Sequence, residues 1–391
     1  MSYKAGRRAV VVGGGIAGLT AAASLLRAGW QVRVLERAIA FSEVGAGLGI
    51  TANGRRALAA IGAEAVLARD GTPIRPVGTR LMDGSWLIKL SAAGQPGTQM
   101  YGMHRQRLHA ALVEAACGAE LSTGSQVVDV RPGDTGSPAV VSVQTDQGED
   151  QVEADFLVAA DGLRSPTRKA LWPDRNVVAS GYTSWRAVIA APGAVSSEFA
   201  MTWGPNAEFG ALPVGHGEIY WYGYAKLSPG TVFDDERQAA RKRFAKWHDN
   251  TQALIAATAA DRLMRHDVWL LDRPLKSYVR GRTVLIGDAA HPMLPTLGQG
   301  ANSALEDGVT VGRVVSPTVE DIPAALREVD RQRRRRTQGL VKQSAAMARL
   351  GAHLGPGWKQ RVRNAAFRRI PPAMAERSGG GFLNWQVPDQ V

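Results

Sequence analysis

The chain opens with a short apolar run, a glycine-rich turn and a longer stretch rich in alanine and leucine. The apolar run is Ala9-Val10-Val11-Val12, and the alanine-rich stretch at 19–28 ends at Gly29. A continuous β-branched run is typical of a buried parallel strand. A glycine directly after an apolar stretch is typical of a helix end. With a second apolar run at 32–36, the pattern predicts a βαβ unit.

The middle of the chain follows a second pattern, in which short alternating runs are interrupted by glycine and proline. Two such runs, residues 207–214 and 218–225, flank Gly215-His216-Gly217, which predicts a β-hairpin. We therefore expect residues 76–100 and 180–270 to form a mostly antiparallel sheet, inserted into the domain that opens the chain.

The last third returns to alternating strands and helices. A short apolar strand at 283–286 precedes a helix that begins near Ala301, and long helices are expected over Ile322–Leu350 and Trp358–Arg369. The complete pattern predicts an α/β fold with helices in a C-terminal segment at 326–391. The opening domain is expected to be discontinuous and to comprise residues 1–75, 101–179 and 271–325.

Length and cysteine usage favour a globular cytoplasmic protein. The chain has 391 residues, 45% of them hydrophobic, which is enough to bury a sizeable core. No apolar run reaches the length that spans a bilayer. The single cysteine, Cys117, excludes an intramolecular disulfide, and we expect it to be buried on or just past a helix over residues 106–116.

Positive charge is concentrated at the C-terminal end. Residues 331–391 contain 13 Lys and Arg against 2 Asp and Glu, a net of +11 out of +12 for the chain. The densest part is Arg331-Gln332-Arg333-Arg334-Arg335-Arg336. Such a run can bind nucleic acid or a membrane surface, but no aromatic residues interleave with it. We expect instead a solvated helix face, or arginines that reach acidic groups elsewhere, and no nucleic-acid partner.

A dinucleotide-binding fingerprint follows the first strand. Gly13-x-Gly15-x-x-Gly18 lies between that strand and the first helix. Glu36 is at the end of the second strand, with 17 residues between it and Gly18. The glycines permit a tight turn and close approach of a pyrophosphate to the helix N-terminus. Glu36 can accept hydrogen bonds from ribose hydroxyls. The fingerprint does not by itself choose between NAD and FAD.

The segment from Gly287 to Asn302, GDAAHPMLPTLGQGAN, points to a flat ligand with a hydroxylated chain. Asp288 presents a carboxylate at the carboxyl end of a strand, where ligands of open α/β sheets bind. Gly298-Gln299-Gly300 then lets bare backbone approach the ligand. The helix start near Ala301 adds unpaired N–H groups and partial positive charge. A flavin has both a hydroxylated chain and an electron-rich ring.

In a third segment, Asp155 to Arg168, an expected buried strand is again followed by an acidic residue and a glycine, Asp161-Gly162. Asp161 could orient backbone or sugar hydroxyls, and Arg168 could hold Asp161 or a phosphate. A surface salt bridge would explain the same residues equally well.

In this order, the three segments resemble the group A flavoprotein monooxygenases, which include p-hydroxybenzoate and salicylate hydroxylases and relatives similar to zeaxanthin epoxidase and urate hydroxylase. The resemblance covers residues 7–350. It implies a Rossmann-type FAD-binding domain, a substrate-binding sheet domain, one non-covalent FAD, and NAD(P)H as co-substrate without a separate nicotinamide domain. No metal is expected, and the protein is expected to be a monomer or homodimer.

The resemblance also implies which residues contact FAD. Glu36 and Arg37 correspond to contacts with the adenosine ribose, Arg105 to the phosphates and ribityl chain, and Val127 to the adenine. The loop from Val44 to Gly49 corresponds to the segment along the flavin. In chain order, the expected cofactor-binding residues are Gly13, Gly15, Ile16, Ala17, Gly18, Glu36, Arg37, Gly49, Arg105, Val127, Asp161, Asp288, Gly298, Gly300, Ala301 and Asn302.

The reaction that this resemblance implies is hydroxylation of an aromatic or heteroaromatic small molecule by NAD(P)H and O2 through a flavin C4a-hydroperoxide. Alternatives that stay open are epoxidation of an isoprenoid or another olefin, a dehydrogenase reaction, and a non-enzymatic basic binding protein. The Trp-x-Trp-x-Ile-Pro stretch of flavin halogenases does not occur. The substrate and the choice between NADH and NADPH are not determined.

Tyr222 and His291 are the candidate catalytic residues, and neither is decisive. His291 lies three residues after Asp288, but a neutral histidine bonded to turn backbone is the more ordinary expectation. Tyr220, Tyr222 and Tyr224 share one strand face, because side chains alternate along a strand. That face could line a pocket, or it could pack the core and leave Trp221 facing the pocket. Glu208 and Arg186 are weaker candidates.

Overall fold

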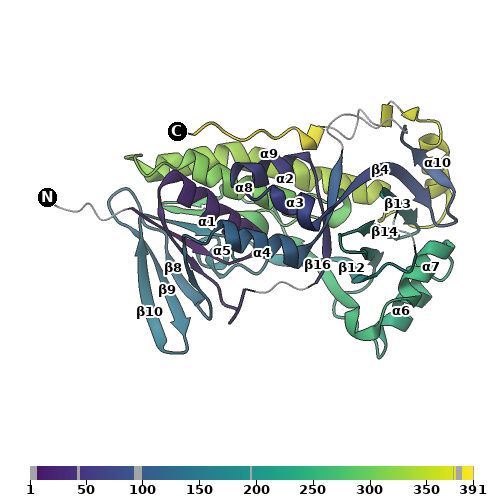
Figure 1. Cartoon of the computed structure of the whole chain (residues 1–391), viewed down its shortest axis with the longest axis horizontal. Helices are drawn as coiled ribbons and strands as arrows, with labels where there is room; N and C mark the ends of the chain where they lie inside the picture. The colour runs from purple at the N-terminus through teal and green to yellow at the C-terminus, as the bar shows by residue number, and fades with distance from the viewer. Residues whose placement is uncertain are drawn as a thin grey trace.

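A parallel sheet with helices and a larger, mostly antiparallel sheet lie side by side along the molecule (Figure 1). The computed structural model describes residues 7–41, 45–91, 99–193, 196–372, 374–375 and 381–390. Val44, at the start of the predicted flavin loop, lies outside these residues. Among the described residues, no helix combines the length and the apolar character needed to cross a bilayer.

The first sheet has six strands in the order β17-β18-β11-β1-β2-β7, and all neighbours are parallel except β17 and β18. This is the predicted Rossmann-type arrangement, with β1 at the centre because its apolar run is buried on both faces. The strands are β1 (Arg8–Val12), β2 (Gln31–Leu35), β7 (Glu120–Ser122), β11 (Phe156–Ala159), β17 (Val279–Arg280) and β18 (Thr283–Leu285).

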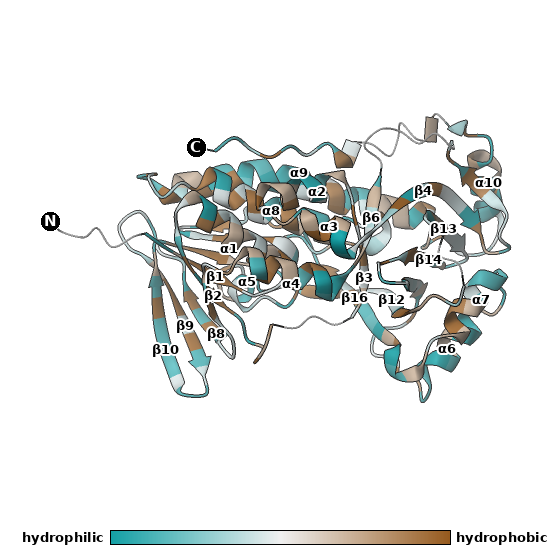
Figure 2. Ribbon diagram, viewed as in Figure 1, coloured by the Kyte–Doolittle hydropathy of each residue, from teal (hydrophilic) through white to brown (hydrophobic). Residues whose placement is uncertain are grey.

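A small antiparallel sheet extends from the same half of the molecule. Figure 2 shows hydrophobic residues along β9 and hydrophilic ones along β10, in agreement with the burial of β9 and the exposure of β10. The strands are β8 (Gln126–Arg131), β9 (Ala139–Thr145) and β10 (Gly148–Ala154).

The large sheet follows the order β16-β12-β15-β14-β13-β4-β6-β3, with β5 paired to β4. The predicted hairpin is confirmed as β14 and β15, although β13 runs parallel to β4. β3 and β6 pair with this sheet even though they come from sequence ranges predicted for the opening domain. The strands are β3 (Gly47–Ile50), β4 (Thr72–Leu81), β5 (Trp86–Lys89), β6 (Met100–His104), β12 (Val177–Ala190), β13 (Glu198–Gly204), β14 (Ala207–Pro213), β15 (Glu218–Lys226) and β16 (Met264–Leu271).

Two central helices and one long helix organise the α layer. α1 packs closely along α8, and α9 contacts α8. The C-terminal end of α9 reaches Trp203 of the large sheet, because a β-carbon at Gly351, directly after α9, would lie 2.5 Å from the Trp203 ring. The helices are α1 (Ile16–Ala28), α2 (Ala52–Ala60), α3 (Ala65–Asp70), α4 (Arg105–Ala115), α5 (Pro166–Leu171), α6 (Glu236–Arg243), α7 (Asp249–Ala256), α8 (Gly300–Val314), α9 (Ile322–Leu350) and α10 (Trp358–Phe367). Short 3-10 turns are η1 (Ala260–Arg262), η2 (Gly287–Ala289), η3 (Pro295–Leu297) and η4 (Gly381–Leu383).

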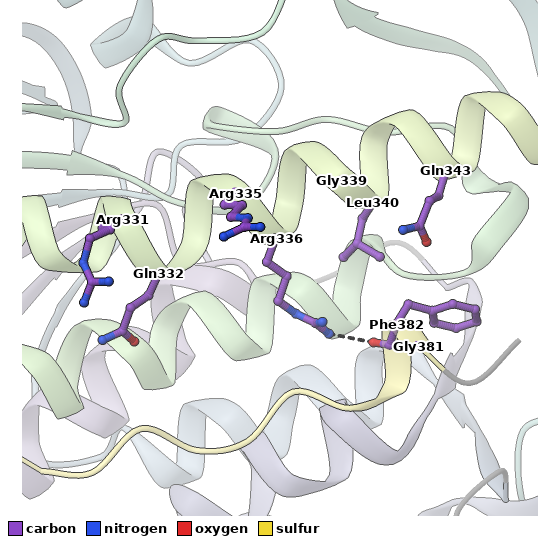
Figure 3. Close-up of a pocket in the computed structure, with 9 residues that line it drawn as sticks. All are labelled: Arg331, Gln332, Arg335, Arg336, Gly339, Leu340, Gln343, Gly381 and Phe382. Carbon is purple, nitrogen blue, oxygen red and sulfur yellow. Dashed lines mark hydrogen bonds between the residues drawn. The ribbon is translucent and has the colours of Figure 1, made fainter. Parts of the chain in front are cut away.

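The described C-terminal residues 381–390 run along the outside of this helix layer (Figure 1). Arg56 Nε donates to the Trp385 carbonyl at 2.7 Å, and Arg336 Nη2 donates to the Phe382 carbonyl at 2.6 Å. Beside Phe382, α9 borders an open pocket of about 370 Å³ whose arginines include Arg331 (Figure 3).

One sequence expectation about α4 is wrong. Cys117 is exposed rather than buried, because α4 ends at Ala115 and the chain turns at the surface before β7. Its exposure removes the expected packing role.

Gly308 sets the spacing between α1 and α8. A β-carbon at Gly308 would lie 2.6 Å from the backbone nitrogen of Ala21, whereas a β-carbon at Gly339 of α9 would meet nothing within 4 Å. We expect Gly308→Ala to lower the free energy of unfolding by about 1–3 kcal/mol, because the helices must separate. Gly339→Ala should leave it unchanged or raise it by up to about 1 kcal/mol. Urea denaturation measures both, and equal effects would contradict the close approach.

Candidate functional site

Four strand ends of the parallel sheet meet at one edge. Val12 is in register with Leu35 on one side and Ala159 on the other, and Ala159 is in register with Leu285. The parallel direction therefore brings the segments that follow these strands together. The segments begin at Gly13, Glu36, Ala160 and Ile286.

The glycine fingerprint packs directly on the Asp-Gly segment. Gly13 has φ of +100°, and a β-carbon there would lie 2.4 Å from the Ala160 carbonyl oxygen, so only glycine fits this turn. The Glu36 carboxylate accepts hydrogen bonds from the N–H groups of Gly14, at 2.7 Å, and Ala38, at 2.9 Å. A carboxylate has about four acceptor positions, so Glu36 retains capacity for a hydroxyl.

The backbone also brings the remaining adenosine-side residues near Glu36. The Glu36 carbonyl accepts from Ser125 N at 2.8 Å, two residues before Val127 at the start of β8. Arg37 follows at an exposed position. Arg105 begins α4, and its N–H donates to the Ala46 carbonyl at 2.8 Å.

Two helices point uncapped N-termini at this edge. α1 begins after Gly15 and α8 after Gln299. Among the described residues, neither N-cap side chain accepts a hydrogen bond from the N–H groups of its helix, and neither first turn carries an acidic residue. The first N–H groups of both helices, including those of Ile16 and Ala17, therefore remain available to an anionic or electron-rich ligand.

Arg168 ties the Asp-Gly segment to the segment of Asp288. Its Nη1 donates to the Ala289 carbonyl at 2.8 Å, and Nη2 donates to the Leu163 carbonyl. Asp161 accepts from Thr167 N at 3.0 Å, and burial raises the pKa of its carboxyl. Asp288 itself is exposed at the edge. Arg168 is thus a buried link rather than a surface salt bridge.

Asn302 joins two expected flavin-contacting positions, Gly49 and Gly298. Its Nδ2 donates to the carbonyls of Gly49, at 2.9 Å, and Gly298, at 3.0 Å. Its Oδ1 accepts from Thr51 N at 3.0 Å. The end of β3, the Gly298 turn (φ +61°) and the start of α8 are consequently held as one unit that also carries Gly300 and Ala301.

A buried ion-pair network lies behind the start of α8. Arg333 Nε donates to Asp307 Oδ1 at 2.6 Å, and its Nη1 lies 2.7 Å from Glu306 Oε2. Arg336 Nε also donates to Glu306 at 2.7 Å. Arg333, Glu306 and Asp307 are each at most 2% exposed. Two arginines of the basic run therefore reach acidic groups within the protein, one of the two alternatives expected from the sequence.

The remaining arginines of the run stay near the helix surface. Arg331 pairs with Glu328, and Arg334 pairs with Asp330, both on α9 itself. Sequence analysis missed Glu306 and Asp307. Their signal was two adjacent acidic residues in a helix whose only other charged residue is Arg313, with a basic run later in the chain that needed partners.

His291 belongs to this network, and the expectation that it bonds to turn backbone is wrong for its side chain. Its Nε2 lies 2.5 Å from Asp307 Oδ2, which also accepts from Gly287 N at 2.8 Å. Burial alone would raise the pKa of Asp307, but the adjacent His291 and Arg333 outweigh it and hold that pKa well below its ordinary value. Asp307 thereby fixes the turn from which Asp288 projects.

The structure decides which face of β15 points toward the cofactor side. The ring of Tyr220 covers Gly47 of β3 so closely that a β-carbon at Gly47 would lie 2.3 Å from it. Trp221, on the opposite face, stacks on Phe209 at 5.4 Å between ring centroids, in the cluster that packs under α6 and α7. The face of β15 that carries Tyr220, Tyr222 and Tyr224, hereafter the tyrosine face, therefore adjoins β3, the strand that contains Gly49.

Glu208 is buried beneath this tyrosine face. Its carboxylate accepts from the Tyr222 hydroxyl and from Trp203 Nε1, both at 2.9 Å. Burial raises the pKa of Glu208 to about 7, although both hydrogen bonds act in the opposite direction. Tyr222 itself stays partly exposed. The face thus combines a buried acid with a partly exposed tyrosine.

Residues 7–344 match the family described as "FAD binding domain". The chain is 35% identical to the aurachin C monooxygenase/isomerase of Stigmatella aurantiaca over 354 residues, covering 89% of this chain and 90% of that protein. It is 31% identical to the 2-heptyl-3-hydroxy-4(1H)-quinolone synthase of Pseudomonas aeruginosa, covering 94% and 95%.

The fold is also similar to that of a solved FAD-containing protein. Klebsiella pneumoniae HpxO, complexed with FAD and uric acid, superimposes with a TM-score of 0.84 at 25% identity, covering 96% of each chain.

Arg333 offers a test of the buried network. We expect Arg333→Met to lower the free energy of unfolding by about 3–5 kcal/mol, because two buried carboxylates lose their shared counter-charge. Arg335→Met removes the same charge from an exposed position on the same helix and should change it by less than about 1 kcal/mol. Chemical denaturation of the two variants decides the point, and similar losses would show that the network adds little.

Proposed function

Because this chain belongs to the FAD binding domain family, we propose that it is a monooxygenase that uses NAD(P)H and O2 to hydroxylate an aromatic or heteroaromatic small molecule. The observation that carries the proposal is the meeting of four strand-end segments beside two uncapped helix N-termini. That arrangement offers the glycine turns, carboxylates and free helix N–H groups that an extended FAD molecule requires.

The proposed FAD site divides into an adenosine end and a flavin end. The N-terminus of α1, with Gly13, Gly15 and Gly18, would hold the pyrophosphate, because its N–H groups are uncapped. Glu36 and Arg37 would contact the ribose, and Val127 the adenine, since the backbone brings these segments together.

The flavin end lies at the opposite side of α1. Asp288 would accept hydrogen bonds from ribityl hydroxyls, and Arg105 would lie along the same chain. The Gly298 turn and the N-terminus of α8 would face the ring, with Asn302 fixing their position. Bound FAD supplies the redox chemistry of oxygen activation, and the positive end of α8 favours negative charge on the ring by about 0.3–2 kcal/mol.

The substrate would bind between the flavin end and the tyrosine face of the large sheet. Relatives support a ring substrate, because one is named for making a quinolone and another was solved with uric acid. His291 is assigned a positioning role, since the residue is 4% exposed and its ring is bonded to Asp307. A single dinucleotide fingerprint in the chain supports NAD(P)H as a transient co-substrate.

Asp288 tests the cofactor site. We expect the purified protein to carry FAD and Asp288→Ala to bind it about 10–100-fold more weakly, because charge-assisted hydrogen bonds of about 1.5–3 kcal/mol are lost. Asp146→Asn, in an exposed turn of the small sheet, is the control and should bind FAD normally. Titration of apoprotein with FAD, followed by flavin fluorescence, gives both constants. Unchanged affinity in Asp288→Ala would refute the assignment.

The reaction is tested by NAD(P)H oxidation with a panel of phenols, quinolones and olefins. We expect a heteroaromatic or phenolic compound to accelerate oxidation and to yield a product with one atom from labelled oxygen gas, detected by mass spectrometry. Conversion of an olefin to an epoxide, with no aromatic compound turned over, would replace hydroxylation by epoxidation. Oxidation of a substrate without incorporation of labelled oxygen would indicate a dehydrogenase.

A further inference from the structure

The tyrosine face contains a buried acid that the binding of FAD does not use. Glu208 is 2% exposed, and both of its oxygens already accept a hydrogen bond, one from Trp203 Nε1 and one from the Tyr222 hydroxyl. A fully buried carboxylate costs free energy unless it is paired or serves a task. No arginine or lysine pairs with it among the described residues, so its direct partners are two neutral donors.

The hydrogen bond from Tyr222 fixes what this residue can offer to a ligand. A phenol has one proton, and Tyr222 donates it to Glu208. Its oxygen can then only accept from the outside. Because the acceptor behind it is a carboxylate, this oxygen is a stronger acceptor than an isolated tyrosine. Glu208 therefore makes Tyr222 selective for a ligand group that donates a hydrogen bond.

Arg186, a hydrogen-bond donor, lies next to the acceptor Tyr222 on the same face. Arg186 of β12 is the register partner of Tyr222, so the two side chains leave the sheet on one side. Its Nη2 lies 2.8 Å from His266 Nδ1, and its side chain also hydrogen-bonds the side chain of Tyr220. Its Nε is buried and has no hydrogen-bond partner among the described residues. The guanidinium thus offers donors to an oxygen of a ligand.

We infer that Tyr222, oriented by Glu208, and Arg186 select a heteroaromatic substrate with a ring N–H and a carbonyl oxygen, as in a 4(1H)-quinolone. The N–H would donate to Tyr222 and the carbonyl would accept from Arg186. This inference rests on the proposed function, because it places the ring beside the flavin end. Partly buried Met100, Phe199 and Met264 around Tyr220 supply an apolar surface for an alkyl substituent.

The same polarity disfavours a simple benzoate. A substrate carboxylate facing Tyr222 would set acceptor against acceptor, with a second negative charge close to Glu208. A ring N–H instead donates a hydrogen bond to Tyr222 and brings no negative charge close to Glu208. It adds a hydrogen bond only while Glu208 is ionised, so binding stabilises the carboxylate whose pKa burial raises to about 7. Glu208 is accordingly a specificity-determining residue that acts through Tyr222.

The test compares 2-methyl-4(1H)-quinolone with its N-methyl derivative, which lacks the N–H. Their dissociation constants are measured on the FAD-loaded protein by calorimetry, without NAD(P)H. We expect the wild type to prefer the N–H compound about 10-fold, as one charge-assisted hydrogen bond of about 1.5 kcal/mol predicts. Tyr222→Phe should bind the two compounds equally. Glu208→Gln should reduce the preference, because an amide can donate to Tyr222 and reverse its polarity.

Tyr224→Phe is the matched control. Tyr224 lies on the same strand face, but its hydroxyl bonds to His353 at 2.7 Å, so the preference should persist. FAD content and circular dichroism verify that each variant is folded. Equal binding of the two quinolones by the wild type, no binding of either, or an intact preference in Tyr222→Phe would each overturn the inference. Failure of the proposed function has a different signature, namely a protein without FAD or without oxygen transfer to any compound.

Discussion

The pairing of Glu306 and Asp307 with Arg333 and Arg336 is the constraint on which the rest of the structure depends. Two adjacent carboxylates sit fully inside the helix layer, where an unpaired charge would cost several kcal/mol. Only α9 supplies their guanidinium partners among the described residues, so α9 must lie against α8 in one register. Because desolvation of the charges offsets much of their attraction, such a network contributes little net stability, whereas loss of one partner is strongly destabilising.

Two short links connect this network to the cofactor edge, and a third connects it to the C-terminal segment. Asp307 accepts from Gly287 N and His291, which fixes the turn that carries Asp288. Glu306 accepts from Asn53 Nδ2 at 2.5 Å, which holds the start of α2 behind β3. Arg336 also donates to the Phe382 carbonyl and so anchors the C-terminal segment. The edge is thereby rigid before any ligand arrives, which lowers the entropic cost of binding.

The large sheet brings a different kind of polarity to the same region. Its two faces divide the aromatic residues, with Trp221 and Phe209 packed under helices and Tyr220, on the other face, packed against β3. On the tyrosine face, one buried acid and one arginine determine which groups can donate and which can accept. The parallel sheet thus fixes the cofactor side through backbone geometry, whereas the large sheet contributes side chains of defined polarity.

The sequence by itself determined the Rossmann-type start, the β14–β15 hairpin, the long helices and the segments that converge at the cofactor edge. These features depend on local patterns, in which each strand, turn or helix start is encoded by consecutive residues. Only the tertiary structure decided the exposure of Cys117, the partners of His291 and the basic run, and the face on which Tyr222 meets Glu208. Those outcomes depend on contacts between residues far apart in the chain, such as the 30 positions that separate Arg336 from Glu306. A periodic pattern shows that two faces exist, but only packing determines what each face touches.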